Sequence, residues 1–489
     1  MKRILSLFLA ILMLLSSATL LFSCGNKAEN ESGTEDEVKK YDEDSIFYER
    51  SLVSDDLEPR DFGGRKFRVV AYTPKEIYIE EEDRNQGDLL KDATFQAVSN
   101  VENRFNVEVD LVYSGDYIET RDYISKTILA SSDEFDLTMG HVLETANIVE
   151  KGLFLNWYDI ENINFSKPWW LPSTTEDLAF DGKCILALSH LTSSAVGGIG
   201  CLYFNKALAA SYELGNLYEI VMNGDWTFDV FMEMVKDVYT DNGNDKRDEG
   251  DFFGMTQESN TFANGWLWAF DNPICAKNAE GIPELVLNSD KIDNIINDIY
   301  NMCYNTPGVW CDYFQPAGAA DCSKLFFNRQ AIFMQSTIGD ATSERLRNFE
   351  DDYGLLPMPK YDENQKGYHS FVGGWHSVLA VPKTVTDTEF VGTIVEALSA
   401  EKWKIYTPTI YEIALKTRYL RDNESKEVLD MIIDGVRFDF GYIGNIGFSF
   451  IIEEMLRDGN NNFQSYFKKK KTDAKYQLKQ MVKAYNKLS

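Results

Sequence analysis

The stretch FRVVAY at residues 67–72 opens a series of alternating strand and helix patterns, and this series decides the fold class. Its β-branched and aromatic residues favour a short strand. Asp88 then precedes an apolar pattern that predicts one face of a helix. The residues of that face recur every three or four positions, at Leu90, Ala93, Ala97, Val101 and Phe105.

The same alternation continues along the chain. Residues 107–111 alternate between apolar and polar side chains as a strand does, residues 117–130 predict a second helix, and residues 135–139 predict a third strand. A β-α-β-α-β order predicts a mainly parallel sheet with helices on both faces, so the fold class is α/β. Later strand candidates lie at residues 200–204, 331–335 and 377–381.

The N-terminus carries an export pattern. Lys2 and Arg3 precede an apolar run over residues 4–22. A basic start, an apolar run and a small residue at the cut site form a secretory signal. The motif LFSC at residues 21–24 resembles the lipobox of bacterial lipoproteins, which implies that residues 1–23 are removed and that Cys24 receives a lipid. The alternative is an uncleaved transmembrane anchor.

Residues 24–60 are predicted to form a flexible acidic tether, because residues 30–37 are polar and acidic and have no apolar period. Folded structure is expected to begin near Gly63 and Gly64. After the signal no apolar run approaches the roughly 20 residues that a membrane span needs. The protein is therefore expected on the outer face of the cell membrane, held there by its lipid.

The charge balance excludes nucleic acid as a partner. The chain has 48 basic and 78 acidic residues, a formal net charge of −30, and repels phosphate backbones. The lysine-rich C-terminus does not alter this prediction, because Lys475, Lys479, Lys483 and Lys487 recur every four residues. This spacing predicts an amphipathic helix with a solvated basic face.

Seven cysteines are present, and six of them follow Cys24. Export permits disulfides, and Cys303 and Cys311 are close enough in sequence to pair; buried free thiols are the alternative. The absence of a CxxC motif from the sequence and the presence of only four histidines argue against a zinc site.

Six segments occur in an order that resembles the extracellular solute-binding proteins of bacterial ABC importers, in the large carbohydrate-binding family. They are DEFDL at 133–137, CLYFNK at 201–206, DWTFD at 225–229, KLFFNRQAIF at 324–333, YGLLPMPK at 353–360 and FVGGW at 371–375. In the fourth segment, NRQ replaces the usual glycine-bearing turn. The resemblance covers about residues 60–470.

The resemblance implies a two-lobed, periplasmic-binding-protein-like fold of type II with discontinuous lobes around a ligand cleft. Lobe 1 would comprise residues 61–195 and 371–407, and lobe 2 residues 196–370 and 408–489. The chain would cross between the lobes near residues 192–198, 370–374 and 406–411. Glycine and serine are frequent in the first two crossings, as expected of segments that absorb backbone rotation.

The resemblance also implies a function. The chain would be a monomeric, surface-anchored receptor without enzymatic activity that captures a sugar or oligosaccharide and delivers it to the permease subunits of an ABC transporter. One alternative is a binding protein for a peptide, an amino sugar or a uronate. The other is a secreted glycoside hydrolase, which needs two suitably spaced carboxylates. The sequence contains no HExxH motif, nucleophile elbow or phosphate loop.

Sugars present hydroxyl groups at their edges and flat C–H faces, so their sites combine aromatic rings with amides, carboxylates and arginine. Trp266 and Trp268 are expected on a strand, where alternate residues share a face. The expected ligand contacts are Tyr72, His141, Trp266, Trp268, Gln335, Trp375, Arg437 and Phe448.

Residues 242–254 resemble an EF-hand-like loop found in this family, and Ca²⁺ takes six to eight oxygen ligands. The expected ligands are Asn242, Asn244, Asp248 and Asp251. Asp245 occupies the position that usually holds glycine. A polar surface loop with an Asx turn is the alternative reading.

Overall fold

The computed structural model describes residues 41, 45, 47–84, 87–257, 261–311, 322–415 and 423–487. The predicted signal peptide and Cys24 lie outside these residues. Among the helices of this described part, none combines the length and the apolar composition that a membrane span requires.

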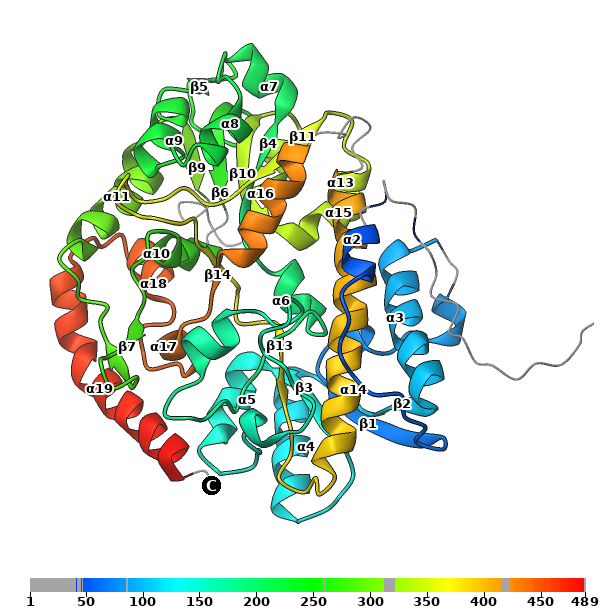
Figure 1. The fold of residues 1–489 in the computed structure, drawn as a ribbon. Coiled ribbons are helices and arrows are strands. Elements are labelled where there is room, and N and C mark those ends of the chain that lie inside the picture. The colour runs from blue at the N-terminus through cyan, green and yellow to red at the C-terminus, as the bar shows by residue number, and fades with distance from the viewer. Residues whose placement is uncertain are drawn as a thin grey trace, which may run out of the picture. The chain divides into compact units, whose positions relative to one another are not determined.

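The first sheet has four strands in the order β13-β3-β1-β2 (Figure 1). β1 pairs in parallel with β2 and β3, while β13 runs antiparallel to β3. The predicted β-α-β-α-β order is therefore confirmed, and a strand from far along the chain completes the sheet. The strands are β1 (Arg65–Ala71), β2 (Val107–Tyr113), β3 (Leu137–His141) and β13 (Ser377–Ala380).

The first two helices beside this sheet begin at acidic N-caps, of which Asp88 was predicted. The carboxylate of Asp88 accepts the backbone N–H groups of Leu90 and Lys91, and Asp116 forms a capping box with Glu119. The apolar face predicted after Asp88 is buried except at Leu90, which is partly buried. The helices are α3 (Leu89–Phe105), α4 (Tyr117–Leu129), α5 (Val142–Val149) and α14 (Thr388–Glu401).

The second sheet has the order β11-β4-β10-β6-β5, and β9 also pairs with β6. β10 is buried along its whole length, parallel to β6 and antiparallel to β4. The strands are β4 (Gly200–Asn205), β5 (Tyr239–Thr240), β6 (Phe252–Gln257), β9 (Val309–Cys311), β10 (Ala331–Thr337) and β11 (Tyr353–Leu356). The helices that follow or precede them are α7 (Lys206–Ser211), α8 (Leu217–Met222), α9 (Phe228–Val235), α11 (Ile292–Asn305), α12 (Ser323–Phe327) and α13 (Glu344–Arg347).

Two small sheets and several helices complete the body (Figure 1). The sheets pair β7 (Cys275–Lys277) with β8 (Pro283–Leu285) and β12 (Ser370–Phe371) with β14 (Val436–Arg437). The helices are α2 (Tyr48–Ser51), α6 (Ser193–Gly197), α10 (Gly265–Ala269), α15 (Thr407–Leu415), α16 (Asn423–Asp434), α17 (Phe440–Ile443), α18 (Ile451–Arg457) and α19 (Phe463–Lys487).

The connections between the sheets lie near the predicted crossings. α6 leads into β4. Ile199, which lies between Gly198 and β4, forms an antiparallel bridge with Val372, which lies between β12 and β13. The first two connections therefore run side by side. The third is helical: a π-turn, η8 (Lys402–Tyr406), joins α14 to α15. The lobe boundaries themselves stay a prediction.

Residues 24–60 were predicted to form a flexible tether, but from residue 47 onward this segment is packed against the rest of the chain. Its α2 helix is ordered because Arg50 lies 4.7 Å from the ring centre of Trp403 and donates a hydrogen bond to Tyr411. Asp55 is buried and forms an ion pair with Arg104 of α3. Folded structure thus begins before Gly63, because these charges pair with residues distant in sequence.

The six cysteines after Cys24 are all buried, and no disulfide joins any two of them in the described part of the chain. Gln257 contacts both Cys303 and Cys311. Its Nε2 atom is 3.7 Å from the sulfur of Cys303 and 4.0 Å from the sulfur of Cys311. The structure thus agrees with the alternative prediction, in which these cysteines are buried free thiols and form no disulfide.

Candidate functional site

A cavity of about 770 Å³ lies where ends of strands from both sheets approach the three connections. Its volume falls within the range of about 300–1,000 Å³ that is usual for ligand pockets. Ligands in open α/β sheets bind beyond the carboxyl ends of the strands, where this cavity lies. Residues that line it include Glu76, Ser194, Ser336, Asp340, Trp375 and Tyr406.

Glu76 enters the cavity from η1 (Pro74–Glu76), the short turn after β1. The residue is 4 % exposed, and one carboxylate oxygen accepts the backbone N–H of Ser194 at 2.6 Å. The other oxygen accepts the hydroxyl of Thr73. A buried carboxylate is stabilised by such donors, so Glu76 has a fixed position in the wall.

Asp340 lines the same cavity from η7 (Ile338–Thr342), directly after β10. Its carboxylate accepts the hydroxyl of Ser336. In the same turn Gly339 approaches the first connection so closely that an added Cβ would lie 2.9 Å from the carbonyl oxygen of Gly197. The second sheet and α6 therefore touch through two glycines at the edge of the cavity.

Trp375 supplies an exposed aromatic surface. Its side chain is 41 % exposed although it lines the cavity, and it follows directly after the second connection. An added Cβ on Gly198 would lie 3.2 Å from its indole ring, so the ring rests against the first connection. Because one part of the ring is supported and another is open, Trp375 can stack on the apolar face of a sugar.

Tyr72 and His141 lie together at the ends of β1 and β3, with ring centres 5.1 Å apart. Tyr117 packs on the same imidazole at 5.4 Å and is 45 % exposed. Burial raises the pKa of Tyr72, and Tyr117 and Glu76 raise it further.

The imidazole of His141 is available for a hydrogen bond. Its Nδ1 atom is buried and has no hydrogen-bond partner among the described residues. Burial lowers the pKa of His141, although Glu144 opposes the shift, so the ring stays neutral at neutral pH. A neutral imidazole can both donate to and accept from a hydroxyl group.

Trp266 and Trp268 are on a helix, α10, and the strand expected there is wrong. The indole N–H of Trp266 donates to Gln257 at 2.7 Å, and Trp266 is fully buried. Gln335 is buried on β10, and its amide lies 3.8 Å from the position of an added Cβ on Gly265. These residues pack the second sheet against α10 in this structure.

Phe448 is fully buried as well. Its ring stacks on Phe467 at 5.4 Å and lies 6.2 Å from Tyr466, both in α19. The structure therefore gives Phe448 a packing contact with the C-terminal helix rather than a position on the 770 Å³ cavity.

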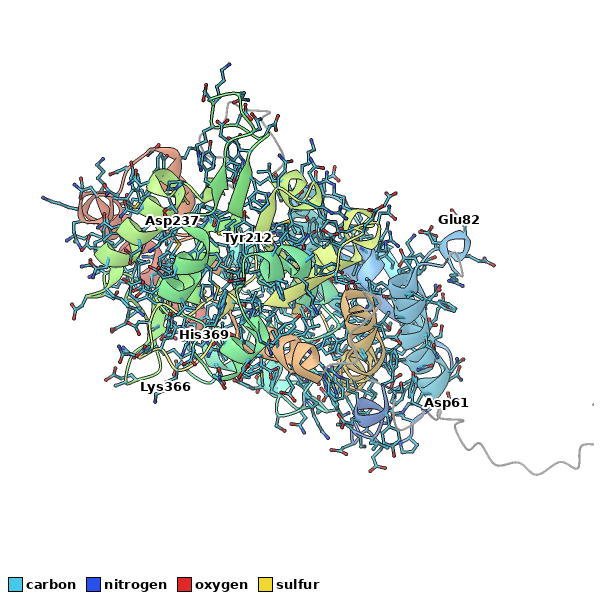
Figure 2. The ribbon with its side chains drawn as sticks, turned by 90° about the horizontal axis from the view of Figure 1, so that it is seen from above. Asp61, Glu82, Tyr212, Asp237, Lys366 and His369 are labelled. Carbon is cyan, nitrogen blue, oxygen red and sulfur yellow. The ribbon has the colours of Figure 1, made fainter. Side chains whose placement is uncertain are left out.

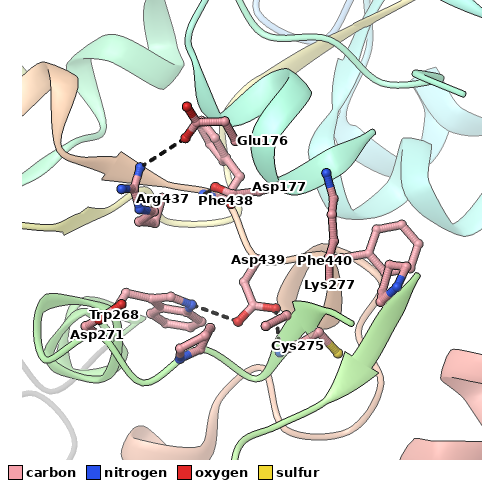
Figure 3. Close-up of a pocket in the computed structure, with 13 residues that line it drawn as sticks. Glu176, Asp177, Trp268, Asp271, Cys275, Lys277, Arg437, Phe438, Asp439 and Phe440 are labelled. Carbon is pink, nitrogen blue, oxygen red and sulfur yellow. Dashed lines mark hydrogen bonds and ion pairs between the residues drawn. The ribbon is translucent and has the colours of Figure 1, made fainter. Parts of the chain in front are cut away.

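Trp268 and Arg437 line a second cavity of about 190 Å³, which is smaller than usual ligand pockets (Figure 3). Trp268 stacks on Phe371 at 4.3 Å and donates its indole N–H to Asp439 at 2.9 Å. Arg437 pairs with Glu176 at 3.7 Å. Because this cavity is so small, the 770 Å³ cavity is the better candidate for a ligand site.

The second cavity also contains Asp177, from the π-turn η4 (Thr174–Leu178). Burial raises the pKa of Asp177 to about 7, although the backbone N–H of Phe438 and the charge of Arg437 lower it. Asp439 keeps a fixed position by accepting four N–H groups, from Trp268, Ile274, Cys275 and Gly441.

The four expected calcium ligands share one loop. Asp251 accepts the backbone N–H groups of Asn242 and Asp248, both at 3.0 Å, and the amide nitrogen of Asn244 donates to Asp248 at 2.8 Å. Asp245 has a φ of 56°, the left-handed conformation for which glycine was expected. Among the described residues no group of three His, Cys, Asp or Glu is arranged around a metal position. Calcium stays a prediction that requires the Asn244 amide to turn.

Sequence comparisons found no match: no family model and no curated protein matches the chain. Solved structures do match. A sugar transporter protein from Rhizobium etli in an open conformation has a TM-score of 0.53 and 12 % identity, over 87 % of this chain and 100 % of that one. An ABC substrate-binding protein from Listeria monocytogenes in complex with cycloalternan has a TM-score of 0.51 and 14 % identity, over 88 % and 99 %.

The chain has the two-lobed fold of solute-binding proteins. UgpB from Mycobacterium tuberculosis in complex with glycerophosphocholine also matches, with a TM-score of 0.50 and 14 % identity over 87 % of this chain and 98 % of that one. The predicted fold class is confirmed, because the likeness spans nearly the whole of each matched chain. At these identities the likeness establishes the fold alone.

Sequence reasoning missed Glu76 and Tyr117 as candidate site residues. Both follow strand ends, since Glu76 comes five residues after β1 and Tyr117 four residues after β2. The rule that ligands bind beyond carboxyl ends of parallel strands would have selected both segments. The pairing of Glu76 with Ser194 had no local sequence signal, because it joins residues 118 positions apart.

Proposed function

We propose that this protein is the surface-anchored substrate-binding component of an ABC importer, and that it captures a sugar or oligosaccharide in the 770 Å³ cavity. The observation that carries the proposal is the position of an open aromatic ring, Trp375, in a cavity walled by Glu76, Asp340 and hydroxyl groups at the junction of a two-lobed fold. Matched structures with this fold include transport proteins with bound sugars.

The lining chemistry supports a neutral, hydroxyl-rich ligand. The charged residues of the cavity wall are Glu76, Asp340, Glu344 and Arg345, three acids against one base. Carboxylates accept the hydroxyl protons of a sugar but repel a uronate or a phosphate. The glycerophosphocholine complex of the Mycobacterium tuberculosis protein indicates that this fold also serves other solutes, so the wall, rather than the fold, supports the choice.

Capture would proceed by closure of the two lobes around the ligand. The first and second connections carry this motion, since they pair through Ile199 and Val372 beside Trp375. A ligand that touches Glu76 and Asp340 at once bridges elements after β1 and β10 and stabilises the closed state. Closure extends only as far as the ligand prefers that state. A dissociation constant in the micromolar range, about −8 kcal/mol, permits both capture and release to the permease.

The anchor completes the proposed receptor. Cys24 and the segment that follows it would hold the protein at the outer face of the membrane, near its permease. Cys24→Ser should abolish surface retention and reduce uptake in cells, and it should leave the sugar affinity of the purified protein unchanged. Unaltered retention of the Cys24→Ser protein would contradict lipid anchoring without bearing on sugar binding.

Titration with a panel of neutral oligosaccharides, followed by tryptophan fluorescence and calorimetry, tests the ligand proposal. We expect saturable binding of at least one member and recovery of that sugar intact. Release of shorter sugars during incubation would favour a glycoside hydrolase instead. Binding of peptides or uronates in place of neutral sugars would contradict the carbohydrate assignment and leave the receptor role in place.

A further inference from the structure

The C-terminal helix α19 (Phe463–Lys487) has a charge opposite to that of the rest of the chain. It carries eight lysines and one acidic residue, Asp473, for a net charge of +7. The whole chain has a net charge of −30, so the remainder carries −37. This positive charge is concentrated in one helix of 25 residues, about 37 Å long.

The basic side chains form one exposed face. At 3.6 residues per turn the exposed lysines fall within an arc of about 160°. They are Lys468, Lys469, Lys471, Lys475, Lys479, Lys483 and Lys487. Tyr476 lies within the same arc and is 65 % exposed. We call these seven lysines and Tyr476 the α19 basic face.

The opposite face of α19 is packed against the body. Phe463, Tyr466, Ala474, Leu478 and Tyr485 are buried. Tyr485 lies 4.7 Å from the ring of Phe180, and Phe448 stacks on Phe467. The helix therefore has no apolar face available for insertion into a bilayer, and its basic face is held in a fixed direction. Figure 1 shows α19 along the outside of the body.

Nearby acids do not neutralise this face. Lys470, outside the face, pairs with Glu454. Among the described residues none of the seven lysines has a carboxylate oxygen within 4.0 Å, and Asp293 near the first turn bonds Gln464 instead. A charged surface without internal partners is free to attract an external anion.

The short range of electrostatic forces determines whether an approaching anionic surface is acted on by α19 or by the acidic remainder of the chain. At physiological ionic strength the Debye length is about 8 Å, less than the roughly 10–12 Å diameter of one helix. An anionic surface that approaches α19 is therefore attracted by the near lysines, while the −37 of the remainder is largely screened. The rest of the chain carries a net negative charge, so it repels an anionic surface on average. The charge pattern thus favours an orientation with α19 toward such a surface.

We propose that the α19 basic face binds the anionic headgroups of the membrane on which the protein is anchored and so fixes the orientation of the body. The packed helix holds its lysines on one exposed face that a charged surface can approach, and basic helices with exposed tyrosine are suited to the headgroup region. Nucleic acid is disfavoured for an exported chain, and a soluble wall polymer is a competing occupant that the experiment separates.

The experiment reports which side of the body faces lipid. The full chain is labelled at a new cysteine, Thr472→Cys, in the middle of the basic face, and incorporated into vesicles whose lipids carry headgroup spin labels. The six described native thiols are buried, and the unsubstituted chain gives the blank for Cys24. A second label site, Glu82→Cys, lies on the side away from α19 (Figure 2).

We expect several-fold stronger quenching at Thr472→Cys in vesicles of phosphatidylcholine mixed equally with phosphatidylglycerol than in phosphatidylcholine alone. The difference should vanish in about 1 M salt, where the Debye length is about 3 Å. It should also vanish when Lys471, Lys475, Lys479 and Lys483 are all changed to Gln. Glu82→Cys should show no dependence on lipid charge.

A matched variant controls for net charge. It has four exposed lysines outside α19 changed to Gln, namely Lys126, Lys246, Lys324 and Lys366. The label in this variant should be quenched as strongly as in the parent chain. Equal quenching in both vesicles, or equal loss in both variants, would overturn the proposal. A response to soluble poly(glycerol phosphate) with none to phosphatidylglycerol would overturn it in favour of a wall polymer. Sugar binding in the same samples is a separate readout, so failure here leaves the proposed function untouched.

Discussion

The carboxylate of Glu76 accepts the backbone N–H of Ser194 at 2.6 Å and thereby joins the turn after β1 to α6, the first connection between the two sheets. Both residues also line the larger cavity. A ligand that competes for this carboxylate therefore acts on the connection as well as on the wall. In the proposed receptor, this pairing would couple binding to the relative motion of the two lobes.

Glu76→Gln should weaken binding of the best oligosaccharide about tenfold, because hydrogen bonds to a charged acceptor contribute about 1.5–3 kcal/mol and the amide retains only part of that. Calorimetric titration measures the change. Glu80→Gln removes the same charge from an exposed residue of the same segment and should leave the affinity unaltered. Equal affinities for the two variants would show that Glu76 does not contact the ligand.

Trp375→Ala should reduce sugar affinity about 30-fold or more, because a central aromatic contact in a binding site contributes about 2 kcal/mol. Tyr212→Ala is the matched control, since Tyr212 is 40 % exposed, close to the 41 % of Trp375, and stacks on Phe252 outside the cavity. Both variants should keep most of their thermal stability. A sugar that binds Trp375→Ala as tightly as the parent would place the site elsewhere.

Glu396 is a buried carboxyl on α14 that accepts the indole N–H groups of Trp169 and Trp170, each at 2.9 Å. Burial raises the pKa of Glu396 to about 7, although these donors and the backbone N–H of Asn164 lower it. A raised pKa means that the folded state binds the proton more tightly. Its contribution to stability is complete below the unfolded pKa near 4.5 and is lost as the pH rises through 7.

The free energy of unfolding should therefore fall by up to about 3 kcal/mol between pH 4.5 and pH 8 on account of Glu396. Glu396→Gln should flatten this part of the profile, which denaturant titrations at several pH values measure. Glu389→Gln, an exposed change on the same helix, should keep the slope of the parent chain. Identical slopes in the two variants would contradict the shift.

The loop with Asn242, Asn244, Asp248 and Asp251 should bind Ca²⁺ weakly, with a dissociation constant of about 10⁻⁴–10⁻³ M, because only two of these ligands are carboxylates and the Asn244 amide must turn. Added Ca²⁺ should raise the melting temperature of chelated protein, and Asp251→Asn should remove the effect. A flat titration of the parent chain would end the calcium prediction.

The first sheet could be predicted well because its signals are local. The apolar face of α3, the cap Asp88 and the alternating strand at 107–111 each depend on neighbours in sequence. The helix at Trp266 and Trp268 was mistaken for a strand because two tryptophans spaced by one residue fit both periods over so short a run. The docking of residues 47–60 depends on partners such as Trp403 and Arg104, which local patterns do not reveal.

The candidate site could be predicted only in part. Tyr72 and His141 were selected as residues after strands and Trp375 as a residue beside a connection. Trp375 lines the cavity, while Tyr72 and His141 pack against each other at the ends of β1 and β3. Trp268 and Arg437 line the smaller cavity, while Trp266 and Phe448 are core residues. An aromatic side chain has the same appearance in sequence whether it packs or binds. Burial, which the tertiary structure sets, distinguishes the two roles.

The central claim is that the cavity beside Trp375 binds a neutral sugar, and a calorimetric titration of the parent chain and Trp375→Ala with the oligosaccharide panel tests it most directly. We predict saturable one-to-one binding in the micromolar range for at least one sugar, and a loss of about 30-fold or more in Trp375→Ala. Absence of binding across the whole panel, or binding that Trp375→Ala leaves intact, would contradict the claim.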